Sequence, residues 1–437
     1  ALINNQFSID DLQIITKEIK LNDIISLARV FQNSPQLFVL DKVIKNGFVT
    51  ANINLSFDEK GKVKENYRIE GSIKRAKLNI INQFKLKNLN FDFDINKNDY
   101  SLKKINTKFD NIEITSPLIE IKHKKNSFFI NGQILNDNRK FDIEELKPIF
   151  SNLSNDINLQ EIEFSSKNNF SFNVNKKLKF NDLKVQSIIE LNKLTVNEKN
   201  LKLKSYLPDF VEKIGFEKHK ININYEKNKF DIKGNGNILL ESKLDNLSYQ
   251  IIKNKNIFIF DSKINLKNNS LLIDFLDYEK KEGSNSLVTI KGNFKKNSLL
   301  SLDLISLKER NNEIIIKGLD LNKNFKIIDI DNFNINYENN KKILNSINLK
   351  KSKSDFIIEG ESFDASIIIN NIMEGNEESS SIFDNLNSKI KINIKKTYID
   401  EVNYMNNLYG NIDYDKNKIN NLELESTFPN KKKINLS

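Results

Sequence analysis

The chain has no cysteine and no tryptophan among its 437 residues, and it has only 13 glycines, 5 prolines and 2 histidines. Without cysteine, there is no disulfide framework and no thiolate ligand for a metal. No run of 18 apolar residues is present, so the sequence offers no helix that spans a bilayer. These absences exclude a disulfide-stapled domain, a zinc–thiolate site and a transmembrane helix within these residues.

The groups that most often carry catalysis are also scarce. His123 and His219 are far apart in sequence, each in a lysine-rich segment ("IKHKK" and "EKHKI"), and we expect both to be exposed. Acidic pairs such as Asp92 and Asp94 fall on one side of an alternating segment, where they are simply its polar half. The sequence therefore predicts a protein that is not an enzyme, with no catalytic residues, no metal site and no cofactor.

The charge pattern argues against a nucleic-acid partner. Lys and Arg number 68 against 58 Asp and Glu, giving a net charge of +10 and a pI near 9.1. The two signs are interleaved along the chain and most of the positive charge is dispersed lysine, whereas a nucleic-acid binder gathers Lys and Arg into a patch. This distribution is typical of a solvated face.

The dominant feature is an alternation of apolar and polar residues. In "LKNLNFDFDINK", apolar side chains occupy every second position and Asn and Asp occupy the others. A period of two is typical of a strand with one wet face, and Asn-, Asp-, Lys- and Gly-rich turns separate the repeats. Up-and-down antiparallel pairing follows. The sequence thus predicts an all-β protein with a few short helices, built as an elongated antiparallel β-meander of repeated units.

Four segments break this period and predict short helices. They begin near Ser8 or Asn22, at Asp142, at Pro208, and at Asp364 with an end near Gly375. We therefore divide the chain into a helical lead-in (1–35), a first β-array (36–140), a helical insert (141–156), a second β-array (157–205), a short helix (206–217), a third β-array (218–360), a short helix with an acidic Ser-rich loop (361–385) and C-terminal strands (386–437).

A long sheet with one apolar face must bury that face or cover it with something else. Its twist curls it into a closed sandwich or an open groove, and an open groove suits acyl chains, because each buried methylene contributes about 0.8 kcal/mol. The alternation then predicts groove-lining residues, whose alternative role is ordinary sandwich core. They are Leu89, Phe91, Phe93, Ile95, Phe170, Phe172, Ile221, Ile223, Phe333, Ile335, Ile390, Ile392 and Ile394.

The C-terminal part resembles a known family. The segment "DFIIEGESFDASIIINNIMEG", followed by "SKIKINIKKTYIDEVNYMNNLYGNIDYDKNKINNLELESTF", is similar to the C-terminal region of AsmA-like proteins, most of all their YhdP-type branch. The resemblance rests on the Gly360–Asp364 turn and the Leu408–Gly410 step, and the upstream array resembles the family's middle portion.

The resemblance implies a periplasmic β-groove folded like a taco, an N-terminal inner-membrane anchor and passage of phospholipid towards the outer membrane. The sequence begins without the anchor helix and ends within the alternating pattern, so we expect it to be an internal piece of a longer chain that contacts membranes through flanking segments. Two hypotheses remain: a bridge-like lipid-transfer protein whose partners are phospholipids, or a structural or adhesive β-repeat scaffold with a self-buried core.

Overall fold

The computed structural model describes most of the chain. The described residues are 2–3, 6–7, 9–31, 38, 41–79, 85–109, 112–150, 158–175, 177, 179–197, 203–240, 243–295, 299–322, 327–373, 388–415 and 418–437. About 73% of the structure is strand, with three short helices in the described part. The prediction of an all-β fold with a few short helices is confirmed.

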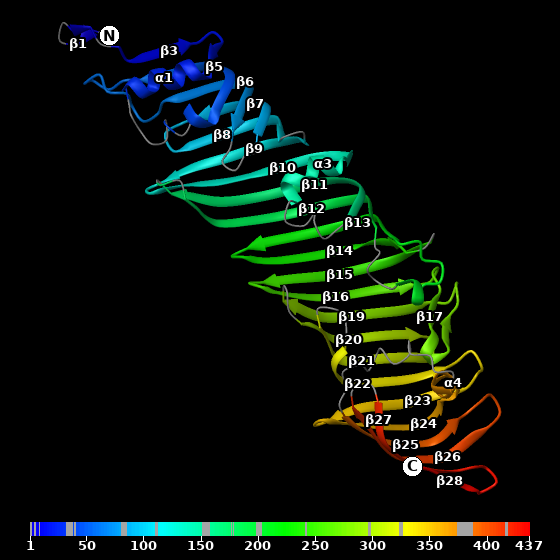
Figure 1. The fold of residues 1–437 in the computed structure, drawn as a ribbon. Helices are drawn as coiled ribbons and strands as arrows, with labels where there is room; N and C mark the ends of the chain where they lie inside the picture. Colours follow the sequence, from blue (N-terminus) through cyan, green and yellow to red (C-terminus); the bar gives the residue numbers. More distant parts are fainter. Residues whose placement is uncertain are drawn as a thin grey trace. The chain divides into compact units, whose positions relative to one another are not determined.

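In the described part of the chain, twenty-four strands belong to one large, mostly antiparallel sheet. Figure 1 shows that strands that follow one another in sequence lie side by side, as a meander requires. The described pairings between neighbouring strands are antiparallel except for β24 and β25, which are parallel. The reversal follows from the connection between these two strands, which includes helix α4 and returns the chain to the starting end of β24.

The chain divides into two compact units. Unit 1 comprises residues 1–156, 161–192 and 220–228, and unit 2 comprises 157–160, 193–219 and 229–437. The strands of the large sheet up to the division are β3 (Asp11–Ile15), β4 (Ile19–Lys20), β5 (Ile44–Ser56), β6 (Arg68–Asn79), β7 (Lys85–Ile95), β8 (Asp99–Phe109), β9 (Ile112–Lys124), β10 (Ser127–Phe141), β11 (Asn158–Asn175), β12 (Phe180–Asn197) and β13 (Lys213–Glu226).

The division passes through β11, β12 and β13, and the remaining strands of the sheet lie wholly in unit 2. They are β14 (Lys229–Leu239), β15 (Leu244–Asn254), β16 (Ile257–Leu266), β19 (Ser286–Lys295), β20 (Leu300–Glu309), β21 (Asn312–Leu321), β22 (Ile327–Glu338), β23 (Leu344–Ser352), β24 (Asp355–Asp364), β25 (Ser388–Tyr398), β26 (Tyr404–Asp415), β27 (Lys418–Thr427) and β28 (Lys433–Leu436). Two small hairpins lie outside the large sheet: β1 (Leu2–Ile3) with β2 (Gln6–Phe7), and β17 (Leu271–Ile273) with β18 (Tyr278–Lys280).

The structure describes three helices, and two of them begin just after an aspartate that the sequence predicted as their N-cap. They are α1 (Leu21–Phe31), α3 (Ile143–Phe150) and α4 (Ser366–Met373). The Asp142 carboxylate accepts a hydrogen bond from the Glu144 N–H at 3.0 Å, and the Asp364 carboxylate accepts one from the Ser366 N–H at 3.0 Å. Each satisfies a backbone donor that the first helical turn leaves without a partner. Ser8, Gly375, residues 151–156 and the acidic Ser-rich loop lie outside the described residues.

Two helix predictions are wrong. Part of the predicted helical lead-in is strand: Asp11–Ile15 pairs with β5, where Ile14 lies opposite Ile53. The predicted helix at 206–217 is also absent: a 3-10 turn at Leu203–Ser205 leads into turns, and β13 begins at Lys213. Leu207 and Phe210 are instead buried in a cluster with Leu240 and Leu247. Burial of these side chains against the sheet outweighed the weak helical pattern. No helix in the described residues is long and apolar enough to cross a membrane.

Candidate functional site

The strand register gathers the apolar side chains of neighbouring strands on one face of the sheet. The side chains of residues paired across an antiparallel ladder point to the same side of the sheet. The apolar side chains of each strand therefore lie beside those of the next strand. Side chains on this face crowd closely: a Cβ atom at Gly71 would lie 2.5 Å from the Phe93 ring. Glycine at this position lets the phenylalanine lie across the neighbouring strand.

In unit 1, one row of facing residues crosses seven consecutive strands, β5 to β11. Each member is paired with the next, and all are half-buried. We call this row the unit-1 strip; it consists of Ile53, Ile69, Ile95, Tyr100, Ile121, Ile130 and Phe172. A sandwich core of this composition would be buried, so the protein's own described atoms leave this row partly uncovered.

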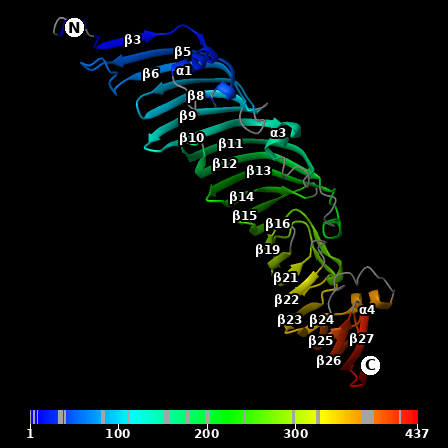
Figure 2. The same cartoon turned by 60° about the vertical axis from the view of Figure 1, so that its left-hand side comes forward.

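The same face is closed at one end of the unit-1 strands. Helix α1 places Leu21 against Val49, Ala76 and Leu89, all less than 9% exposed, and Figure 2 shows the helix beside β5 and β6. Helix α3 places Leu146 against Ile112 and Phe141 in the same manner. The helices therefore cover the strand ends opposite the hairpin tips 96–98 and 124–126, and they leave the strip open.

Unit 2 repeats this arrangement with a second row across seven strands, β19 to β25. Its members are again paired one to the next and half-buried. We call this row the unit-2 strip; it consists of Ile290, Ile305, Ile316, Phe333, Leu349, Ile358 and Ile392.

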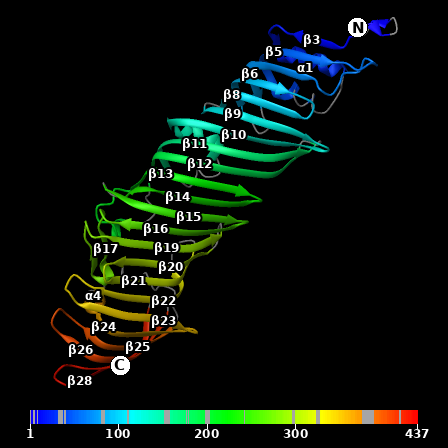
Figure 3. The same cartoon turned by 180° about the vertical axis from the view of Figure 1, so that it is seen from behind.

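The row beside the unit-2 strip is buried. On five of these seven strands, the residues two positions from the strip are Leu307, Ile314, Ile335, Ile347 and Ile394, which are 1% to 9% exposed. They form one cluster with Leu276 and Tyr278 of the β17–β18 hairpin. Figure 3 shows β17 and α4 at the ends of these strands. The hairpin is thus the cover of this row.

Two buried tyrosines hold the β17–β18 hairpin on the sheet through hydrogen bonds. The Tyr278 hydroxyl donates to the Glu309 carboxylate at 2.5 Å, and the Tyr337 hydroxyl donates to the Leu276 carbonyl at 2.5 Å. The two rings meet edge to face, with centroids 5.5 Å apart. Burial raises the pKa of both phenols, and for Tyr278 the Glu309 carboxylate adds to this effect. Both therefore remain protonated donors across the physiological range.

The structure places the predicted groove residues in three settings. Ile95, Phe172, Phe333 and Ile392 belong to the two strips. Leu89, Ile335 and Ile394 are buried under the covers. The others are half-buried and occupy the alternating apolar positions of their strands. They are Phe91 and Phe93 in β7, Phe170 in β11, Ile221 and Ile223 in β13, and Ile390 in β25.

The opposite face of the sheet is mostly polar and carries cross-strand ion pairs, although Ile257 and Ile259 are exposed on it. Examples are Lys308 with Glu313 at 2.5 Å and Lys291 with Asp261 at 2.8 Å. A hollow of about 320 Å³ lies on this polar face in unit 2, lined by side chains such as Asn334, Asn348 and Glu359. This hollow therefore lies on the other side of the sheet from the unit-2 strip.

The two histidines differ, which corrects one prediction. His123 is exposed as expected, but His219 is only 2% exposed. The His219 imidazole lies over Gly236, its Nε2 atom is 2.8 Å from the Asn237 carbonyl oxygen, and burial lowers its pKa. Gly236 provides the space that the ring fills. The described residues contain no group of three or more His, Asp or Glu placed to hold a metal ion.

The covering hairpin is the feature that sequence reasoning missed. Segment 271–278, "LLIDFLDY", has apolar residues at consecutive positions within an otherwise alternating array. That local loss of the two-residue period is a signal for a segment that packs onto the sheet instead of joining it.

Searches of family models, curated proteins and solved structures found no match to this chain.

Proposed function

We propose that this chain is a bridge-like lipid-transfer protein that holds phospholipid acyl chains on its apolar strips. One observation carries the proposal: in each unit, seven strands in a row present facing apolar residues that the described part of the protein leaves half-buried. A row of this kind is an uncovered apolar surface in water, and an acyl chain covers it at a gain in free energy.

The dimensions suit this ligand. Neighbouring strands are about 4.8 Å apart, so the six intervals of each strip span about 29 Å. A bilayer's hydrocarbon core of about 30 Å is two tails thick, so one tail covers about three strand intervals. Removing a tail of about 16 carbons from water contributes on the order of 12 kcal/mol, at about 0.8 kcal/mol per methylene. Each strip is therefore long enough to hold one acyl chain at several equivalent positions.

Equivalent positions are what transfer requires. The members of each strip are mostly isoleucine, and among them only Tyr100 of the unit-1 strip carries a polar group. A tail can then exchange one set of contacts for the next at little cost. The proposal assigns the chain no chemical step, and places it in the periplasm, attached to the inner membrane through a segment outside this sequence and passing phospholipid to the outer membrane.

The alternative function is a structural or adhesive scaffold, which the covers favour. Clusters such as Ile335 with Tyr278 are sealed by the protein itself. If the strips were also sealed in solution, by self-association for example, no acyl chain would enter. Bound lipid separates the two functions.

The test uses protein purified without detergent. Native mass spectrometry and lipid extraction should recover stoichiometric phospholipid, and a photoreactive phenylalanine analogue at Phe333 should crosslink to it. The matched control is the same analogue at Asn334, the next residue on β22, which lines the polar hollow. Lipid-free protein, or equal crosslinking at both positions, would refute the proposal and leave the scaffold.

A further inference from the structure

The proposed function leaves open what holds the polar end of a lipid. In unit 1, the hairpin tip between β9 and β10 carries Lys124 and Lys125, and the tip between β11 and β12 carries Lys177 and Lys179. Ser127 pairs with Lys124 on one side and with Asn175 on the other, so the two tips lie side by side. We call these four exposed lysines the basic tips.

The basic tips are an uncompensated positive patch. Within the described residues, none of the four lysines forms an ion pair, whereas Lys108 and Lys140 at the other end of the strands pair with Glu113 and Glu161 at 2.9 and 2.6 Å. The nearby Asp182 carboxylate accepts a hydrogen bond from Asn173 at 3.0 Å. Clustered lysines that form no ion pair attract an anion.

The patch adjoins the unit-1 strip through aromatic side chains. Phe172 of the strip lies three residues, or about 10 Å, from the tip at Asn175. The Phe180 ring lies 5.5 Å from the Phe172 ring and is 69% exposed. On the neighbouring tip, the rings of Phe128 and His123 are 4.9 Å apart. An apolar surface that ends in aromatic rings and then in lysines matches the order of tail, interface and phosphate in a phospholipid.

We infer that the basic tips bind the phosphate of a phospholipid whose acyl chain lies on the unit-1 strip, which favours anionic headgroups. The inference rests on the proposed function, because the tail on the strip brings the phosphate to the tips. A tail that runs from the strip past Phe180 ends at the edge of the sheet that carries the four lysines. The Lys124 ammonium lies 4.8 Å from the centroid of the Phe129 ring, on the face opposite the strip, so its flexible stem must turn around this edge to reach the phosphate.

The test compares two short-chain ligands below their micelle concentrations by calorimetry: dioctanoyl phosphatidylglycerol, and dioctanoylglycerol, which has the same tails and no phosphate. In K124Q/K125Q/K177Q/K179Q, the dissociation constant for phosphatidylglycerol should rise at least about tenfold, while that for dioctanoylglycerol stays unchanged. Phe180→Ala should weaken both ligands equally. Raising NaCl from about 50 to about 500 mM should weaken only phosphatidylglycerol binding to the wild-type protein.

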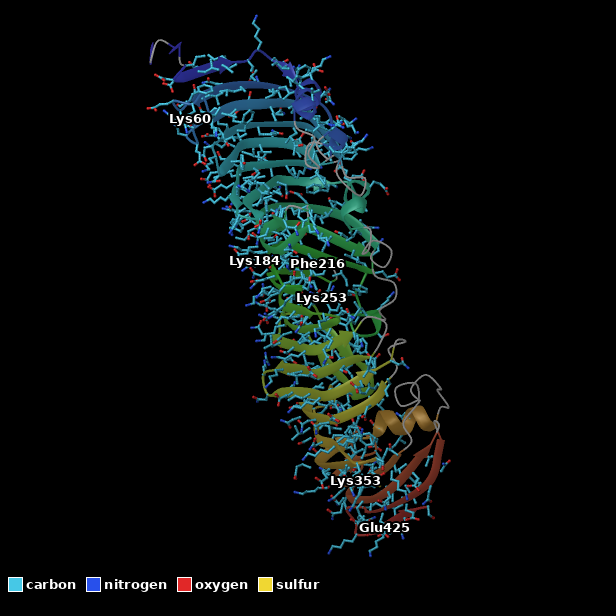
Figure 4. The ribbon with its side chains drawn as sticks, turned by 90° about the vertical axis from the view of Figure 1, so that its left-hand side faces the viewer. Lys60, Lys184, Phe216, Lys253, Lys353 and Glu425 are labelled. Carbon is cyan, nitrogen blue, oxygen red and sulfur yellow. The ribbon has the colours of Figure 1, made fainter. Side chains whose placement is uncertain are left out.

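The matched control is K60Q/K62Q/K64Q/K97Q, which removes four lysines from the neighbouring tips β5–β6 and β7–β8 of the same unit. Lys60, labelled in Figure 4, follows Asp58 and Glu59 in the sequence, and Lys97 pairs with Glu65. This variant should bind both ligands as the wild type does.

Three outcomes would overturn the inference, and each identifies a different fault. Unchanged phosphatidylglycerol binding in the basic-tip variant would remove the headgroup site and leave the strip. Binding of neither lipid by the wild type would remove the proposed function as well. Inorganic phosphate that binds as tightly as phosphatidylglycerol, and loses this binding in the basic-tip variant, would mark a free-anion site without a tail.

Discussion

Ile392 and Ile394 lie two residues apart on β25, on the same face of the sheet, yet their surroundings differ. Ile394 is 4% exposed and packs in the cluster that includes Tyr278, whereas Ile392 is half-buried in the unit-2 strip. In the sequence, "SKIKINIKK", the two positions are equivalent. Alternation therefore decides which face a residue occupies, and a hairpin more than 100 residues upstream decides which of the two is covered.

Unit 1 obtains the same division from a different element. Helix α1 covers Leu89, while Ile95 at the other end of β7 remains in the open strip. A helix and a hairpin thus serve one purpose, since either can bury an apolar row. The covers give each unit a core, so the strips are not needed for that purpose.

The strongest test of this division is Ile392→Asp. We expect the variant to fold, because the side chain is half-buried and can reach water, and to lose nearly all lipid crosslinked at positions 333 and 358 of the unit-2 strip. A carboxylate in an apolar row repels an acyl chain, because burying the charge has a large cost. Bound lipid would be measured by crosslinking and extraction.

Ile392→Leu is the control for that variant, because it keeps the strip apolar. It should retain lipid at the wild-type level. Wild-type occupancy in Ile392→Asp would show that the strip does not hold the tail.

Ile394→Ala should have the largest effect on stability. Truncating a fully buried isoleucine typically costs about 2–5 kcal/mol, including the cavity left behind. Ile392→Ala on the same strand should cost about 1 kcal/mol, because part of that side chain is already in water. Denaturant unfolding measures both, and equal losses would mean that the two rows are covered alike.

Tyr278→Phe tests how the hairpin is held in place. The substitution removes the hydroxyl that donates to Glu309, which is 8% exposed, and should cost about 1.5–3 kcal/mol because the acceptor is charged and buried. The matched control is Tyr409→Phe, which removes an exposed hydroxyl bonded to Glu425 (labelled in Figure 4). That pair is in water, so thermal unfolding should change little. Equal losses would contradict a specific role for the cover.

Much of the fold could be predicted from the sequence because a period of two is a local property. The alternation around Phe91, Phe93 and Ile95 predicts strand, face and meander together. The helix predicted at 206–217 failed because Leu207 and Phe210 are buried by distant residues such as Leu247, which no local pattern records. The same limit applies to the candidate site: alternation identified the apolar face, but it did not separate Phe333 of the strip from Ile335 under the cover.

His219 shows the same limit for a polar residue. Its lysine-rich neighbours predicted exposure, yet the ring is buried over Gly236, near the rings of Phe216 and Tyr249. A glycine on the adjacent strand leaves a space that the imidazole fills, and only the strand register brings the two residues together.

This burial predicts the smallest effect, a pH dependence of unit 2. Desolvation lowers the folded-state pKa of His219 below 6.5, and the hydrogen bond to Asn237 only partly opposes it. The unfolded chain therefore binds the proton more tightly, and stability rises with pH across this window. The contribution is fully present above about pH 6.5 and is lost as the pH falls through the folded pKa. Denaturant unfolding at pH 5 and 7.5 should show this loss for the wild type and for His123→Gln, whose exposed side chain serves as the control, and a smaller loss for His219→Gln. An identical pH dependence in all three proteins would show that the buried imidazole does not resist protonation.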